Sequence, residues 1–202
     1  MAGRDPLATQ RRILDAARKE FAAKGISGAR VDAIAARAST NKRMLYYYFR
    51  SKELLFREVL RQRLVRRPGD PVIEDGPYSE WLRRRVAVPA TWREYTRLLM
   101  WEALEARGRS SKILAADERR AAYGVLRARL AKAQAEGDLP TDLDLDQMLL
   151  SELALVTFPV AFPQIVRLVT GYAADSPEFI AKREEHLRQL GALLAAERAP
   201  SG

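Results

Sequence analysis

The sequence contains no cysteine, one histidine and no long apolar run. Without cysteine the chain cannot form a disulfide, and it offers no thiolate for a metal site or for nucleophilic catalysis. His186 stands alone, so it can build neither a usual metal site nor a histidine-based catalytic triad. No paired carboxylates stand out as an acid–base couple. We therefore expect no catalytic residue, no metal site and no cofactor.

Membrane and export signals are also missing from the sequence. No apolar run approaches the roughly 20 residues that a membrane-spanning helix needs. The first residues, MAGRDPLATQRR, lack the apolar middle of a signal peptide. At 48% hydrophobic residues the chain can bury a sizeable core. We expect a globular, cytoplasmic protein with no membrane partner.

The positive charge of the chain is unevenly distributed. Residues 1–67 hold 17 Lys and Arg against 6 Asp and Glu, whereas the rest of the chain holds 18 against 20. Because cations that neutralise phosphates release condensed counterions, a nucleic acid is a natural partner for the first third. A solvated basic surface that only keeps the protein soluble explains the charge equally well.

No segment alternates like a strand, and almost every segment has helical periodicity, so we predict an all-α fold. Asp5 and Pro6 suit the start of a first helix and Gly25 its end. Asn41 and Ser51 suit the N-caps of two later helices. The other helices expected in this part are 31–38, 42–49 and 52–66. The short connection between the first two of these predicts a helix-turn-helix at about 31–49.

The proline- and glycine-rich stretch RRPGDPVIEDGP, residues 66–77, marks a boundary between two domains, 1–66 and 67–202. Thr141 or Asp142 suits one helix start in the second domain, and Ser176-Pro177-Glu178 suits another. The helices expected in this domain are 78–88, 91–107, 113–136, 144–171 and 177–197.

Residues 11–55 contain the pattern RRILDAARKEFAAKG…VDAIAARASTNKRMLYYYFRSKELL, which closely resembles the N-terminal domain of TetR-family transcriptional regulators. The spacing holds over four successive helices, about residues 9–60. The resemblance implies a three-helix DNA-binding domain followed by a larger all-helical domain that binds a small molecule and dimerises. The matching residues are Ile13, Leu14, Ala16, Ala17, Phe21, Gly25, Ile34, Ala35, Leu45, Tyr46, Phe49, Ser51, Lys52 and Glu53.

The sequence departs from the family pattern around the turn and the recognition helix. Ser39 stands where the turn usually has glycine, which predicts either a different turn or a strained Ser39. Arg30 stands where a threonine commonly caps the second helix, and Arg43 and Met44 replace residues that are often small. These changes fall where bases are read, so the family pattern does not supply an operator sequence.

The helix at 42–49 divides its residues between the core and DNA. Leu45 and Phe49 share the buried face, while Arg43 suits two hydrogen bonds to guanine. The resemblance places Tyr46 at the groove. The full set of predicted DNA contacts is Arg30, Thr40, Asn41, Lys42, Arg43, Met44, Tyr46, Tyr47, Tyr48 and Lys52.

Several of these residues have a second interpretation. Lys42 binds either bases or phosphates, and Asn41 is as well suited to capping the helix as to touching DNA. Tyr48 either donates to a phosphate or packs against a neighbouring helix. Lys52 begins a helix, where its ammonium and the free backbone amides can hold a phosphate. Arg4, Arg11 and Arg12 could contact phosphates or the minor groove through a flexible arm, but a solvated face is the simpler interpretation.

The second domain carries two candidate regions for a ligand pocket. Proline at 159 and 163 should kink the helix at 144–171. The kink either opens a gap that forms a ligand pocket or leaves a bent helix that is fully packed in a dimer. Together with the helix at 144–171, the apolar stripe on 177–197, which includes Leu187, is a candidate four-helix dimer interface. Glu102 is expected to be solvated unless it faces the pocket. The pocket candidates are Trp92, Tyr95, Leu99, Glu102, Phe158 and Phe162.

From the resemblance we expect a ligand-responsive, sequence-specific transcriptional regulator, a homodimeric repressor. It would bind double-stranded DNA at a pseudo-palindromic operator, and an unknown small-molecule effector would release it. One alternative is an effector-independent regulator whose second domain only dimerises or binds a partner. A weaker alternative is an enzyme with its active site in the helical domain.

Overall fold

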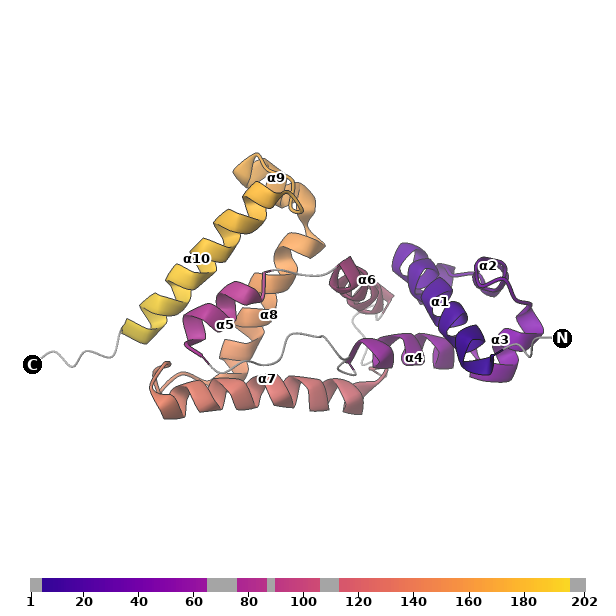
Figure 1. Ribbon diagram of the computed structural model, residues 1–202, viewed down its shortest axis with the longest axis horizontal. Coiled ribbons are helices and arrows are strands. Elements are labelled where there is room, and N and C mark those ends of the chain that lie inside the picture. Colours follow the sequence, from indigo (N-terminus) through magenta and orange to yellow (C-terminus); the bar gives the residue numbers. More distant parts are fainter. Residues whose placement is uncertain (1–4, 65–75, 87–89, 106–112, 197–202) are drawn as a thin grey trace, which may run out of the picture. The chain divides into compact units, whose positions relative to one another are not determined.

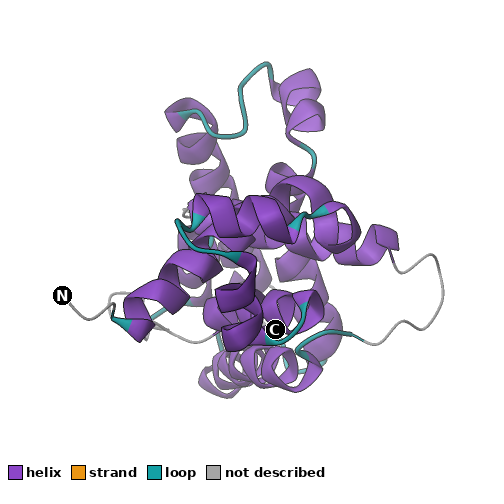
Figure 2. Ribbon diagram, turned by 90° about the vertical axis from the view of Figure 1, so that its right-hand side faces the viewer, coloured by secondary structure: helices purple, strands orange, loops and turns teal. Residues whose placement is uncertain are grey.

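A computed structural model describes residues 5–64, 76–86, 90–105 and 113–196 of the chain. All regular secondary structure in these ranges is helical (Figure 2). The contacts divide the chain into two compact units. The first unit contains residues 1–66 and 90–119, and the second contains residues 67–89 and 120–202.

The first unit holds the helix-turn-helix, α6 from further along the chain and the start of α7 (Figure 1). Its helices begin and end within three residues of the predicted bounds. They are α1 (Pro6–Gly28), α2 (Val31–Arg37), α3 (Lys42–Phe49), α4 (Lys52–Leu64), α6 (Ala90–Glu105) and the start of α7 (Ala116–Glu136).

Three helices of this unit begin at the predicted N-caps. The Asp5 carboxylate accepts a hydrogen bond from the Leu7 amide at 2.9 Å, and the Asn41 side chain accepts one from the Met44 amide at 2.9 Å. The Ser51 hydroxyl oxygen accepts one from the Leu54 amide at 3.1 Å. Each bond satisfies an amide that has no partner within its helix. These cap predictions are confirmed.

The core of the first unit is apolar and joins α1, α2, α3, α4 and α6. The rings of Phe21 and Phe56 meet edge to face, with centroids 5.1 Å apart. α6 packs along α1, where the Trp101 indole N–H donates to the Ala22 carbonyl at 3.3 Å. By its contacts α6 therefore belongs with the helix-turn-helix, although it lies beyond residue 66. The functional division at residue 66 stays a prediction. The buried core includes Ile13, Ala17, Phe21, Ile34, Leu45, Leu55, Phe56, Leu60 and Leu98.

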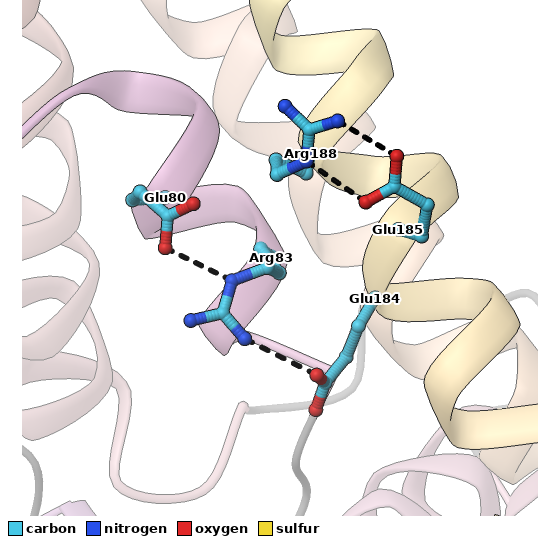
Figure 3. Close-up of polar contacts among 5 residues, drawn as sticks. All are labelled: Glu80, Arg83, Glu184, Glu185 and Arg188. Atoms are coloured by element: carbon cyan, nitrogen blue, oxygen red, sulfur yellow. Dashed lines mark hydrogen bonds and ion pairs between the residues drawn. The ribbon is translucent and has the colours of Figure 1, made fainter.

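The second unit packs its helices around another core. Its helices are α5 (Tyr78–Arg84), most of α7, α8 (Leu145–Ala161), α9 (Pro163–Thr170) and α10 (Pro177–Ala196). α10 lies along α5. Arg83 of α5 binds Glu80 of the same helix at 2.9 Å and joins the two helices by binding Glu184 of α10 at 3.2 Å (Figure 3). The buried residues are Tyr78, Leu82, Leu130, Ala133, Leu139, Leu149 and Leu187.

The kink predicted at the prolines of 144–171 is present, but the prediction of one helix there is wrong. The segment forms two helices, α8 and α9, bent by 87° at the residue between them, Phe162. Pro163 has no backbone N–H to continue α8, and proline suits the first turn of a new helix. Pro159, in contrast, lies inside α8.

Three further expectations about this unit change. Asp144, rather than Thr141 or Asp142, caps α8 by accepting from the two following amides at 2.8 and 3.0 Å. α5 ends at Arg84 instead of near residue 88. Leu187, in the stripe predicted to form a dimer interface, is fully buried inside the chain because α10 packs on α5.

The apolar segment made by α8 and α9 also bears on membrane crossing. Within the described ranges no single helix is both long and apolar enough to cross a bilayer. α8 and α9 reach that length and composition only together, and the 87° bend separates them.

Candidate nucleic-acid interface

The turn between α2 and α3 is closed by backbone hydrogen bonds around a left-handed residue. The amides of Ser39 and Thr40 donate to the carbonyls of Ala36 and Ala35, at 3.1 and 3.0 Å. This pairing is the Schellman arrangement, which usually has glycine at the position where Ser39 stands. Ser39 has φ of 50°, so it adopts the strained conformation that the missing glycine predicts.

The side chain of Arg12, in α1, stabilises the same turn. The Arg12 guanidinium donates to the Ala38 carbonyl at 3.3 Å and to the Thr9 hydroxyl at 3.2 Å. Arg12 is exposed, as a solvated face predicts, and it also binds the end of α2. Its charge completes the end of α2, where carbonyl groups lack helical partners.

α3 presents one buried edge and one exposed face, as the helical spacing predicts. Leu45 is fully buried, and Phe49 packs against the same core while remaining half-buried. Tyr46 is 40% exposed and Tyr47 is 75% exposed. Because the buried edge fixes the rotation of the helix, the residues on the other face point toward solvent in a defined register.

The two cations at the start of α3 differ in their surroundings. Arg43 is exposed and has no hydrogen bond or ion pair with any residue in the described part of the chain. Lys42 lies 3.3 Å from the Asp32 carboxylate, also at the surface. Exposed pairs contribute only about 0.5 kcal/mol, so Asp32 does not prevent Lys42 from reaching a phosphate.

The residues around the turn have mixed roles. Asn41 is occupied as the cap of α3, and Thr40 and Met44 are half-buried. The Arg30 side chain is exposed and makes no cap for α2, while the Arg30 amide donates to the buried Glu20 carboxylate at 3.4 Å. The loss of a threonine cap therefore leaves α2 without a side-chain cap.

Tyr48 packs in the first unit, which is one of the two interpretations that its sequence position left open. It is half-buried against the apolar core, and its ring centre lies 5.2 Å from that of Tyr47 and 6.3 Å from that of Phe49. It also lines an open groove of about 820 Å³ with residues of α1 and α4. A contact between its hydroxyl and DNA stays a prediction.

Lys52 is tied to the end of α1. Its ammonium donates to the carbonyls of Ser27 and Ala29, at 3.3 and 3.4 Å. An ammonium has three donors, so one remains, and Lys52 stays partly exposed at the first turn of α4. The side chain thus holds α4 against α1 and still has a donor for a phosphate.

The predicted pocket residues of α6 lie in the first unit. Tyr95 is buried and Leu99 is half-buried in the apolar core with α1. Glu102 is not solvated, because it pairs with Arg119 at 2.6 Å and accepts from the Leu114 amide at 3.2 Å. The Trp92 side chain lies outside the described residues.

The predicted pocket residues of α8 lie in the second unit. Phe158 and Phe162 have ring centres 5.2 Å apart and are 44% and 40% exposed. A ligand contact for these two, or for the α6 residues, stays a prediction.

A group of buried polar residues in the second unit was not predicted. Its members are Tyr78, Trp81, Arg85, Arg129 and Glu152. The sequence did contain a signal, because Glu152 is the only charged residue in the apolar run at 149–162. A lone acid inside an apolar helix is costly unless it has partners or a function.

The geometry of the first unit defines the class of the protein. A basic recognition helix follows a tight turn, and its apolar edge is buried. At its start lies an exposed arginine that pairs with no described residue. A helix-turn-helix with these features inserts its second helix into the major groove, so the chain is a DNA-binding regulator.

Comparisons with known proteins identify the family. Residues 13–59 match bacterial regulatory proteins of the tetR family, and residues 83–190 match the tetracyclin repressor-like C-terminal domain. The chain belongs to the TetR family. It is a DNA-binding transcriptional repressor by these matches, and the proteins that it resembles are regulators rather than enzymes.

Individual relatives cover most of the chain or its DNA-binding part. The transcriptional repressor SCO4008 of Streptomyces coelicolor is 33% identical over 171 residues, which are 85% of this chain and 88% of that protein. The repressor NicS of Pseudomonas putida is 50% identical over 52 residues, 26% of this chain and 24% of that protein. The crystal structure of the regulator SCO4942 of Streptomyces coelicolor aligns with a TM-score of 0.62 and 26% identity, covering 91% and 96% of the two chains.

Proposed function

We propose that this repressor binds a pseudo-palindromic operator as a homodimer and that a small molecule releases it. The observation that carries the DNA-binding part is α3, whose buried Leu45 fixes the helix while Arg43 is exposed and pairs with no residue that the structure describes. Two copies of α3 related by a two-fold axis would enter successive major grooves, which requires two matching half-sites.

In this proposal Arg43 reads a guanine and its neighbours position the helix. A guanidinium can donate two parallel hydrogen bonds to guanine O6 and N7, which discriminates bases. Lys42, Tyr47 and Lys52 suit phosphate oxygens, because their donors are at the surface and need no base edge. Tyr46 is exposed enough to meet a thymine methyl group. The remaining proposed contacts are Arg30, Thr40, Asn41, Met44 and Tyr48.

The first test replaces the proposed base-reading residue. Arg43→Ala should weaken binding to the operator by about 1–3 kcal/mol and relax the preference at one base pair of each half-site. Fluorescence anisotropy against fragments from the neighbouring genes, at physiological salt, measures both effects. Arg97→Ala removes an exposed arginine of α6 and serves as the control. Equal binding of all DNA sequences by the unaltered protein would sink the proposal.

Lys52→Ala should act differently, because it should weaken binding to all DNA sequences by the same factor. It should also lower the slope of log affinity against log salt concentration by about 1. Because Lys52 binds two carbonyls at the end of α1, urea unfolding must show that the variant stays folded. A change in sequence preference would contradict the phosphate role.

Dimerisation is supported by apolar side chains that α8 and α9 expose. Leu168 is 85% exposed and Val169 is 77% exposed. Exposed apolar surface of this kind marks an interaction site when it is contiguous. The other exposed apolar residues of these helices are Leu150, Phe158, Phe162 and Ile165.

Leu168→Glu should shift the protein toward the monomer in analytical ultracentrifugation, because a buried carboxylate costs several kcal/mol. Leu104→Glu, which alters a leucine of α6 that is 69% exposed, is the control. An unchanged sedimentation coefficient for both variants would place the interface elsewhere.

The effector response is the remaining part of the proposal. A ligand can release DNA only to the extent that it prefers the conformation that binds DNA weakly. A repressor whose operator affinity no small molecule changes would instead be the effector-independent regulator that the sequence also allows.

A further inference from the structure

The second unit contains a buried polar cluster, defined here as Tyr78, Trp81, Arg85, Arg129 and Glu152. Tyr78 and Trp81 belong to α5, Arg85 follows it, and the other two come from α7 and α8. The guanidinium carbons of Arg85 and Arg129 lie 5.2 and 6.0 Å from the centre of the Trp81 ring. Both guanidinium groups therefore lie beside the same indole ring.

Several polar atoms of this cluster are buried without a hydrogen-bond partner among the described residues. Five of them are donor atoms: the Tyr78 hydroxyl, the Trp81 indole nitrogen, Arg85 Nε, and Arg129 Nε and Nη1. Two are acceptors, the oxygens of Glu152. Glu152 and Tyr78 are each 1% exposed and Arg129 is 5% exposed, so bulk water does not reach most of these groups.

Burial dominates the electrostatics of the cluster. It raises the pKa of Glu152, although Arg85, Tyr78, Trp81 and Arg129 all oppose the shift. It also lowers the pKa of Arg85. The Tyr78 and Trp81 donors are near enough to affect the carboxylate, yet neither reaches the geometry of a hydrogen bond.

A purely structural ion pair does not account for this arrangement. Buried charges stabilise a fold only when they pair closely and satisfy one another, and leaving one unpaired costs about 3–5 kcal/mol. Glu152 forms no hydrogen bond or ion pair with a described residue. This is so although the cluster contains two guanidinium groups, which both lie beside the Trp81 ring. The unsatisfied atoms therefore indicate a further group that binds between them.

The balance of donors and charge selects the chemistry of that group. Two guanidinium groups and one carboxylate give a net positive charge, and the unpaired donors outnumber the unpaired acceptors. An anion with acceptor oxygens satisfies both imbalances, and a carboxylate matches the guanidinium fork. A cation at Glu152 would face both arginines at close range. The leucines beside the cluster, among them Leu82, Leu130 and Leu149, suit an apolar body.

We infer that the polar cluster is the effector site and that it binds an organic carboxylate with an apolar body. The two arginines bind the carboxylate, and Glu152 accepts from a hydroxyl or an ordered water beside it. This inference rests on the proposed effector response for its regulatory meaning, but the binding site can be tested without DNA.

The test uses the full-length protein and matched probes. Benzoate and hexanoate carry a carboxylate, benzamide and hexanamide are neutral counterparts, and benzylamine and hexylamine are cations. Thermal unfolding and isothermal titration calorimetry measure the binding of each probe. The carboxylates should raise the melting temperature with increasing concentration, whereas the amines should not.

Three variants give the site a signature that a nonspecific effect would not reproduce. Arg85→Met should lower benzoate affinity about 10-fold or more, because it removes a charge-assisted donor. Glu152→Gln should raise it about 3-fold or more, because it removes the negative charge beside the ligand. Arg127→Met removes an exposed arginine of α7 that pairs with Asp146, and it should change nothing. If Arg85→Met does not fold, Arg85→Lys, which keeps the charge without the planar fork, replaces it.

The possible outcomes separate this inference from the proposed function. Binding of the amines in place of the carboxylates, with loss in Glu152→Gln, overturns the inference, as does the absence of binding by any probe. Operator binding by the unliganded protein is measured in parallel, and its failure would sink the proposed function instead. A carboxylate that binds with the expected variant pattern but leaves operator affinity unchanged would establish the binding site and exclude its role as an effector site.

Discussion

Among the described residues each unit buries one glutamate, and the two glutamates are in opposite situations. Glu20, in the first unit, is 3% exposed and accepts from Lys24 at 2.8 Å and from the Arg30 amide at 3.4 Å. Glu152, in the second, is 1% exposed and has no such partner among the described residues. Glu20 therefore has its hydrogen-bond partners within the first unit. The second leaves polar groups open, as a site for another molecule requires.

The largest loss of stability is expected from a substitution at Gly25, in the first unit. It has φ of +70°, and a Cβ there would lie 2.6 Å from Glu105 Oε1 and 3.0 Å from the Trp101 ring. Gly25→Ala should therefore lower the free energy of unfolding by about 2–4 kcal/mol, through backbone strain and overpacking. Urea unfolding followed by circular dichroism measures the change.

The matched control for that substitution is Gly124→Ala. Gly124 lies within α7, and a Cβ there would meet nothing within 4 Å. Alanine should stabilise this helix by up to about 1 kcal/mol. A similar loss of stability in both variants would mean that the close contact at Gly25 is not the cause.

Glu20→Gln tests whether the polar contacts of the first unit stabilise it. The Lys24 ammonium holds the pKa of Glu20 below its ordinary value, so the carboxylate stabilises the fold above pH 4.5. That contribution is lost as the pH falls through the lowered pKa. The variant should lose about 1–2 kcal/mol of stability at pH 7. Unfolding curves between pH 3 and pH 7 should converge with those of the unaltered protein at the acidic end.

The same substitution in the second unit should have the opposite sign and a smaller size. Because burial raises the pKa of Glu152, its contribution to stability is present below the ordinary value of 4.5 and is lost as the pH rises through the raised pKa. Glu152→Gln should melt at a higher temperature than the unaltered protein at pH 7, and the difference should shrink toward pH 4. A destabilised variant at pH 7 would show that Glu152 is paired like Glu20.

The smallest effect is expected at the turn of the helix-turn-helix. Ser39→Gly removes the strain of φ at 50° but makes the unfolded chain more flexible, so stability should rise by only about 0.5 kcal/mol. Thermal unfolding at matched pH measures it. A decrease would mean that the Ser39 side chain contributes more than its backbone conformation costs.

Local chemistry explains what the sequence predicted well. The caps at Asp5, Asn41 and Ser51 depend on residues within three positions, and the buried edge of α3 depends on helical spacing alone. The family pattern extended these features to a DNA-binding fold.

What the sequence did not predict involves residues far apart in the chain. Arg12 binds a carbonyl 26 positions away, and Lys52 binds carbonyls 23 and 25 positions away. The unpaired state of Glu152 depends on α5, α7 and α8 together. The kink at Pro163 was predicted, but its size was not, because packing around the break sets the angle between α8 and α9.

The dimer proposed through the exposed apolar surface of α8 and α9 would make stability depend on protein concentration. If a second copy covers Leu168 and Val169, as proposed, folding and association are one equilibrium, and dilution alone favours the unfolded chain. The melting temperature of the unaltered protein should then rise with its concentration, whereas that of Leu168→Glu should depend on concentration far less. The subunit concentration in the cell would in that case set how much of this repressor is folded, as well as how much of its operator is occupied.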